Sequence, residues 1–78
     1  MELKKVISSH LDMVGYDALN STMMIQFKTG DIYEYSGVDE QTYNDLLTSQ
    51  SIGQYFTKNI RNRFSYKKLG NEKDLLKV

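Results

Sequence analysis

The stretch from Met23 to Tyr35 constrains the fold of this chain more than any other, because it has the pattern of a β-hairpin. Two runs of mostly apolar and aromatic residues flank the segment Lys28-Thr29-Gly30. That segment suits a three-residue loop with Gly30 in the left-handed conformation, which glycine adopts without steric cost. The pattern therefore predicts two antiparallel strands joined by a tight turn.

The turn also sets the register of the hairpin, and a shift by one residue would move every side chain to the opposite face. A three-residue loop puts Ile25 opposite Tyr33 and Met23 opposite Tyr35. The face expected to pack under the helices then carries Met23, Ile25, Phe27, Tyr33 and Tyr35. The other face carries Met24, Gln26, Ile32 and Glu34. A two-residue loop would separate the aromatic residues from the best apolar ones, so we reject it.

Upstream of the hairpin, the chain from Ser8 to Tyr16 has alternating side chains and predicts a first strand. A short polar connection follows from Asp17 to Ser21. A connection this short favours an antiparallel neighbour, because the chain has little room to cross over. The sequence therefore predicts a meander of three antiparallel strands.

Downstream of the hairpin, Gly37 ends the sheet and a first helix follows. Asp39 is a good N-cap, because its side chain can accept a hydrogen bond from a free backbone N–H of the first turn. The residues at helical spacing that form the expected buried stripe are Tyr43, Leu46 and Leu47. This helix is expected to end near Ser49.

A second helix begins after Ser51, which can cap it while Gln54 reaches back in a capping-box arrangement. The apolar residues that repeat every fourth position are Ile52, Phe56 and Ile60. Continuing the helix would bring Arg63 onto this apolar stripe, so the helix is expected to stop near Asn62.

The segment from Phe64 to Leu69 is expected to be extended again, either as a further strand or as an ordered arm across the core. We therefore predict an α+β fold with a three-stranded antiparallel meander packed against two helices, and a short C-terminal strand or arm. The expected domain organisation is an N-terminal lead (1–5), a single domain (6–69) and a polar, frayed tail (70–78).

The chain has 78 residues, and one domain of that size needs a core dense in large side chains. Six Tyr and three Phe supply that area. The absence of Cys excludes a disulfide framework and a thiolate zinc site, and it favours a reducing cytoplasm. No apolar run has the length of a signal-peptide core or a membrane span, so we expect a soluble, cytoplasmic protein without membrane association.

The net charge is zero, but the charges are unevenly distributed. Lys28 is the only base between Asp12 and Asp45, whereas residues 46–71 contain bases and no acid. Basic and aromatic side chains interleave in this second segment, which suits the phosphates and bases of a nucleic acid. The candidate nucleic-acid-binding residues are Lys58, Arg61, Arg63, Tyr66, Lys67 and Lys68. The alternative is a solvated surface that balances the acidic half of the molecule.

Ser8, Ser9, His10 and Asp12 have the residue types of a nucleophile and its base, but not the geometry. Neighbours on a strand point to opposite faces, so Ser9 and His10 diverge, and His10 shares only an edge face with Asp12. A single His without Cys also gives no metal-ligand set. We therefore expect no catalytic residues, no metal and no cofactor, in a domain that is not an enzyme.

Several short motifs together resemble the KTSC domain over about Val6 to Leu69. The motifs are Ser8-Ser9, Gly15-Tyr16-Asp17, Tyr33-Glu34-Tyr35, Gly37-Val38, Ser51-Ile52-Gly53-Gln54-Tyr55-Phe56 and Ile60-Arg61. That family takes its name from a segment at the C-terminus of some lysyl-tRNA synthetases, and it also occurs as small stand-alone bacterial and phage proteins. This association implies RNA binding. It does not imply lysine tRNA charging, since no aminoacylation machinery could fit in this chain.

Two further interpretations concern the sheet. Tyr33 and Tyr35 could stack on bases, as aromatic residues on the sheets of RNA-binding modules do. The hairpin register instead points both rings inward and predicts a core role, with their hydroxyls at the rim. The uncovered face, with Met24 and Ile32, or a sheet edge could also bind a protein partner or a second copy of this chain.

Overall fold

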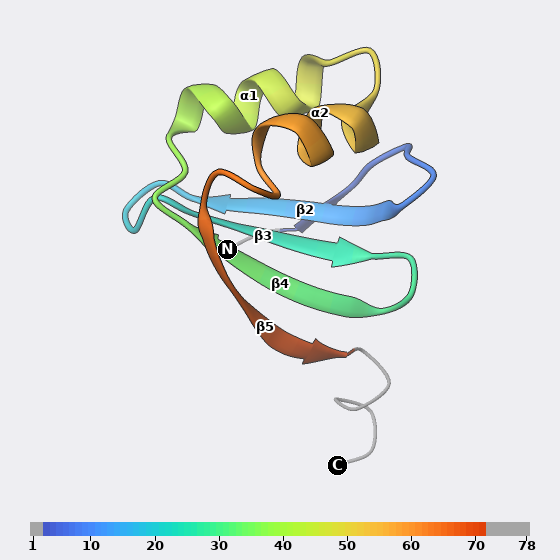
Figure 1. The fold of residues 1–78 in the computed structure, drawn as a ribbon, viewed down its shortest axis with the longest axis horizontal. Helices are drawn as coiled ribbons and strands as arrows, with labels where there is room; N and C mark the ends of the chain where they lie inside the picture. Colours follow the sequence, from blue (N-terminus) through green and yellow to red (C-terminus); the bar gives the residue numbers. More distant parts are fainter. Residues whose placement is uncertain (1–2, 72–78) are drawn as a thin grey trace.

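The computed structural model describes residues 3–71 of the chain. Within them, five strands form one antiparallel sheet in the order β1-β2-β3-β4-β5, and two helices cover one of its faces (Figure 1). The strands are β1 (Leu3–Lys5), β2 (Leu11–Asp17), β3 (Thr22–Phe27), β4 (Asp31–Ser36) and β5 (Ser65–Asn71), and the helices are α1 (Glu40–Thr48) and α2 (Ile52–Asn59). The predicted α+β class is confirmed.

The sheet has more strands than the predicted three-stranded meander. β2, β3 and β4 form that meander, and β1 and β5 add one strand at each edge. β1 was missed because it is only three residues long and two of them are Lys, so it carries no alternating apolar pattern. For the segment after α2, the sequence left a strand and an arm open, and it forms the strand β5.

The edge strands also extend beyond the expected domain limits. β1 lies within the segment expected as a lead, residues 1–5, and it pairs with β2 from Leu3↔Gly15 to Lys5↔Met13. β5 continues past residue 69 through Gly70 and Asn71, which pair with β4. The rest of the expected tail, residues 72–78, lies outside the described residues.

The hairpin of β3 and β4 has the predicted register, in which Ile25 faces Tyr33 and Met23 faces Tyr35. Gly30 has a φ of 96°, and its N–H donates to the carbonyl oxygen of Phe27 at 2.9 Å. Only glycine adopts this conformation without strain, so the loop fixes which side chains of both strands face the helices.

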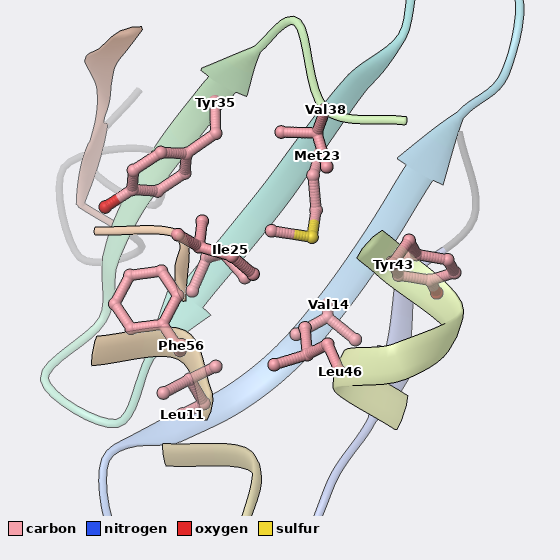
Figure 2. Close-up of a cluster of buried hydrophobic side chains, with 10 residues drawn as sticks. Leu11, Val14, Met23, Ile25, Tyr35, Val38, Tyr43, Leu46 and Phe56 are labelled. Carbon is pink, nitrogen blue, oxygen red and sulfur yellow. The ribbon is translucent and has the colours of Figure 1, made fainter. Parts of the chain in front are cut away.

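The core lies between the sheet and the helices (Figure 2). It consists of Leu11, Val14, Met23, Ile25, Tyr35, Val38, Tyr43, Leu46, Phe56 and Ile60. Phe27 and Tyr33 are half-buried and pack against this cluster. The prediction that one face of the hairpin packs under the helices is therefore confirmed, and the core role of Tyr35 follows from its exposure of 4%.

The opposite face of the sheet carries Gln26 and Glu34, as predicted, because alternate residues of a strand point to opposite faces. Gln26 is nevertheless buried, with an exposure of 7%. It lies on the central strand and pairs with Met13 of β2 and Ile32 of β4. Gln26 is thus buried on the face of the sheet that neither α1 nor α2 covers.

The strand β2 begins later than predicted, because the chain before it forms a local turn. The Ser8 hydroxyl oxygen accepts hydrogen bonds from the backbone N–H groups of His10 and Leu11, at 3.2 and 3.3 Å. Such local bonds compete with strand pairing. The register then shifts between Leu11 and Met13, and this bulge lets Leu11 and Val14, three residues apart, both enter the core.

Both predicted helix caps are present. An Asp39 carboxylate oxygen accepts from the N–H of Thr42 at 3.0 Å, and the Ser51 hydroxyl accepts from the N–H of Gln54 at 3.3 Å. α1 ends at Thr48, as predicted, whereas α2 ends at Asn59, before its expected limit near Asn62. No helix among residues 3–71 has the length and apolar character to cross a membrane.

Candidate functional site

A cleft with a volume of about 740 Å³ opens between α2 and the side of the sheet formed by β4 and β5. Pockets for small ligands typically have volumes of about 300–1,000 Å³. The cleft is lined by His10, Leu11, Phe27, Asp31, Tyr33, Tyr35, Gly53, Phe56, Thr57, Arg61, Asn62 and Tyr66. Its lining therefore combines aromatic rings with a few polar and charged groups, which is typical of a binding site.

The aromatic rings of the cleft contact one another in a closed circuit. The circuit runs from Phe27 to Phe56, Tyr35, Tyr66, Tyr33 and back to Phe27, with ring centroids 5.5–5.8 Å apart. Its exposure rises from 3% at Phe56 to 60% at Tyr66. The inner rings thus hold Tyr66 in place, and its remaining surface is available to a ligand.

Tyr35 is the most buried tyrosine that lines the cleft. Burial raises the pKa of its hydroxyl to about 12, although the positive charge of Arg61 opposes part of the rise. In Figure 2 the hydroxyl oxygen points away from the other labelled core side chains. At neutral pH the group is protonated, so it can donate a hydrogen bond but cannot act as a base.

The turn after α2 brings Arg61 and Asn62 to the cleft. The N–H groups of Ile60 and Arg61 both donate to the carbonyl oxygen of Phe56, at 3.0 and 2.9 Å. This shared acceptor closes the last turn of the helix. Ile60 enters the core, and Arg61 is left exposed at the edge of the cleft.

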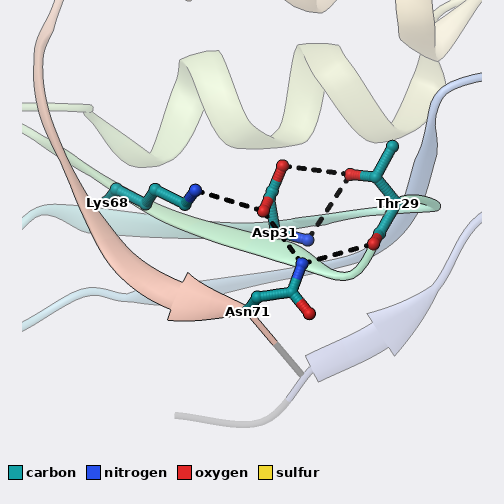
Figure 3. A network of polar contacts seen from close by, with 4 residues as sticks. All are labelled: Thr29, Asp31, Lys68 and Asn71. Atoms are coloured by element: carbon teal, nitrogen blue, oxygen red, sulfur yellow. Dashed lines mark hydrogen bonds and ion pairs between the residues drawn. The ribbon is translucent and has the colours of Figure 1, made fainter. Parts of the chain in front are cut away.

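A polar network surrounds Asp31 at the opposite end of the cleft (Figure 3). Its carboxylate accepts from the Asn71 side-chain amide at 2.9 Å and from the Thr29 hydroxyl at 3.2 Å, and it lies 3.3 Å from Lys68 Nζ. The Asn71 amide, and then Lys68, hold the pKa of Asp31 below its ordinary value of 3.8. The network fastens the end of β5 to the hairpin turn.

This lowered pKa predicts how stability depends on pH. The folded state favours the charged Asp31 carboxylate, so its contribution is present above the ordinary pKa and is lost as pH falls through the lowered one. The thermal midpoint should therefore fall between about pH 5 and pH 2, and less steeply in Asp31→Asn. Asp17 and Asp39 also have lowered pKa values, so part of the slope remains. Parallel slopes for both proteins would contradict the assignment.

Of the six residues suggested by the sequence, Arg61 and Tyr66 line the cleft together. Lys68 lies on β5 on the same face of the sheet as Tyr66, because it pairs with Tyr33 while Tyr66 pairs with Tyr35. Its charge is already partly balanced by Asp31. The cleft therefore has one exposed guanidinium beside one exposed aromatic ring.

The other three suggested residues lie elsewhere. Lys67 alternates with Tyr66 along β5 and points to the uncovered face, where its Nζ lies 3.9 Å from Glu34. Lys58 is exposed on α2 and lines a smaller hollow. Arg63 is exposed in the turn after α2 and lines neither hollow. The basic segment is thus continuous in sequence but divided over several surfaces.

Sequence reasoning did not identify several residues of the cleft, chiefly His10, Gly53, Thr57 and Asn62. Gly53 and Thr57 are four positions apart on α2, so helical spacing could have placed them on one face. His10 lies before β2 and reaches the cleft only through the packing of that loop against α2. No pattern in the sequence signals that contact.

Of the four residues with the types of a nucleophile and its base, Ser8 has a local structural role and His10 lines the cleft. The Ser8 hydroxyl stabilises the turn before β2. Among residues 3–71, no group of three or more His, Cys, Asp or Glu side chains is arranged to hold a metal ion.

Comparison with known proteins identifies the family. The model of the KTSC domain matches residues 7–64. A lysine–tRNA ligase of Nostoc punctiforme is 33% identical over 67 residues, which is 86% of this chain and 12% of that enzyme. A protein of Tsukamurella paurometabola is 29% identical over 62 residues, which covers 80% of this chain and 92% of that protein. The chain thus spans only a small part of the lysine–tRNA ligases that it matches.

A solved structure agrees with these matches. The crystal structure of a KTSC domain protein from Yersinia pestis has a TM-score of 0.86 to this structure and 32% sequence identity, over 88% of this chain and 97% of that one. The family model and the shared fold lead to one conclusion: this chain belongs to the KTSC domain family.

Proposed function

We propose that this domain binds single-stranded RNA without catalysing a reaction on it, and that the cleft beside α2 is the contact surface. The observation that carries the proposal is that the exposed Tyr66 ring, which packs against Tyr33 and Tyr35, lines the same cleft as the exposed Arg61. Exposed aromatic rings stack on unpaired bases, and a guanidinium binds phosphate through several donors.

The relatives support RNA ahead of DNA as the ligand. A lysine–tRNA ligase contains a segment similar to this chain, and the name of that enzyme states tRNA as its substrate. Two features of the cleft favour binding over chemistry. The Tyr35 hydroxyl is protonated, and the Asp31 carboxylate is occupied by Asn71 and Lys68. A cytoplasmic location and the absence of a cofactor stay predictions.

The test is a binding screen of the purified domain against single-stranded RNA, duplex RNA, tRNA and DNA at several salt concentrations. For single strands, the logarithm of the binding constant should fall with the logarithm of salt by about 0.7 per phosphate contact. Arg61→Gln should flatten this slope by about 0.7 and weaken binding about fivefold at 0.1 M salt for all sequences alike, since phosphate contacts do not read bases.

Arg63→Gln is the matched control, because it makes the same chemical change just outside the cleft. It should leave both the affinity and the salt dependence nearly unchanged. An affinity for RNA that is indifferent to salt, or equal effects of the Arg61 and Arg63 variants, would contradict the proposal.

A second candidate function is self-association or binding of a protein partner through the uncovered face of the sheet. The specific observation is that neither α1 nor α2 covers this face (Figure 1), although it carries half-buried Met24 and Ile32. Sedimentation at increasing protein concentration tests it. If the measured mass stays that of a single chain at all concentrations, self-association is contradicted, and binding of a different protein is the alternative that stands.

A further inference from the structure

A second, smaller hollow adjoins the cleft along α2. This hollow has a volume of about 300 Å³ and is lined by Ser9, His10, Ser51, Gly53, Gln54, Thr57 and Lys58. His10, Gly53 and Thr57 line both hollows. We call the two adjoining hollows the groove; Tyr66 lies in its larger, aromatic hollow and Lys58 in its smaller, polar hollow.

The absence of a side chain at Gly53 lets the Ser8–His10 turn pack closely against α2 where the two hollows meet. A methyl group at this position would lie 3.2 Å from the Ser8 hydroxyl oxygen and 3.8 Å from the His10 ring, which are the groups on the opposite wall. Glycine inside a helix is unfavourable relative to alanine, so its presence in the first turns of α2 calls for a local reason. The close approach of the Ser8–His10 turn supplies one.

The charged side chains along the groove indicate where the phosphates and the base of a bound strand would lie. Asp31 lies at the hairpin-turn end of the larger hollow, away from Tyr66 in the register of β4 and β5, and it repels phosphate, although its charge is partly balanced by Lys68. The exposed cations Arg61 and Lys58 both lie on the α2 side, one in each hollow. Phosphates are therefore favoured along α2, away from Asp31, and a base is favoured at the exposed Tyr66 ring.

We infer that this groove holds two consecutive nucleotides of a single strand, with one base stacked on Tyr66 and the next phosphate bound by Lys58. The inference rests on the proposed function and deepens it, because it names the length and the orientation of the bound segment. Arg61 binds the phosphate of the stacked nucleotide, and the strand passes from one hollow to the other over the residues that the two hollows share.

The experiment compares uridine monophosphate, the dinucleotide pUpU and an octauridylate by calorimetry or fluorescence anisotropy. We expect a large gain in affinity from the mononucleotide to the dinucleotide and a much smaller gain beyond it. Lys58→Gln should weaken the dinucleotide about fivefold at 0.1 M salt, through loss of one phosphate contact, and should leave the mononucleotide unchanged. Lys67→Gln is the matched control on the uncovered face, and it should change neither affinity.

Gly53→Ala tests the junction independently. The added methyl group requires Ser8 to move by a few tenths of an ångström, while the helix gains a better helix former, so the thermal midpoint should stay near that of the parent. The dinucleotide should lose affinity and the mononucleotide should not.

Two outcomes distinguish a failure of the groove inference from a failure of the proposed RNA binding. If the octauridylate binds but Lys58→Gln and Lys67→Gln have equal effects, or the dinucleotide binds no better than the mononucleotide, the groove inference is wrong and RNA binding stands. If none of the probes binds and the RNA screen is also negative at low salt, the proposed function is wrong and the groove inference falls with it.

Discussion

Replacing Tyr35 by alanine is expected to lower the free energy of unfolding by about 3–5 kcal/mol, because it removes a large aromatic side chain from the packed core. The Tyr35 ring contacts both Phe56 and Tyr66, with centroids 5.5 and 5.6 Å apart, so its loss leaves a cavity under the cleft. A domain of 78 residues has a stability of about 4–12 kcal/mol. Urea denaturation followed by circular dichroism should show a strongly lowered midpoint or a largely unfolded population.

Tyr35→Phe is the control, since it keeps the ring and removes only the hydroxyl. It should change the stability by no more than about 1 kcal/mol, the usual net contribution of one hydrogen bond. If Tyr35→Ala instead unfolds at the parental midpoint but no longer binds RNA, the ring acts as a binding surface and its core role is wrong.

Replacing Tyr66 by alanine is expected to have the opposite profile, with a large loss of RNA affinity and a small loss of stability. Stacking of a base on an aromatic side chain contributes about 1–3 kcal/mol, which corresponds to a loss of about 5- to 150-fold in affinity. The ring is 60% exposed, so its removal should destabilise the fold much less than Tyr35→Ala does. Tyr66→Phe should retain most of the affinity, since the stacking face is preserved.

The matched control for Tyr66→Ala is Leu69→Ala. Leu69 is also a large, exposed apolar residue of β5, with an exposure of 42%, but it does not line the cleft. Its loss should leave RNA binding unchanged. A Tyr66→Ala variant that binds as tightly as the parent would remove the main support for the proposed contact surface.

Local signals in the sequence were sufficient for the hairpin and the helix starts. Gly30 favours one loop geometry. That geometry determines which face of the sheet each side chain of β3 and β4 points to. Asp39 and Ser51 satisfy free N–H groups of their own helices, which is a property of a few adjacent residues. These features depend on little beyond the nearest neighbours in the chain, so a single sequence can predict them.

The edge strands and the cleft depend on contacts between distant residues, and these could be predicted only in part. Leu3–Lys5 becomes a strand because β2 offers it an edge, not because of its own composition. Lys67 and Lys68 are adjacent in sequence, yet the alternation of β5 puts them on opposite faces. Because the sequence did not establish β5 as a strand, it could not separate their roles.

The order of the strands has a consequence for how the cleft is assembled. Neighbouring strands from β1 to β4 are joined by short connections, whereas β4 and β5 are separated by residues 37–64, which include both α1 and α2. Among the connections of the sheet, this longest loop carries the largest entropy cost of closure. Tyr66 lies on β5, so the outer wall of the cleft exists only while β5 is paired with β4. A ligand that bridges Tyr66 and α2 would therefore also stabilise the pairing of β5 with β4.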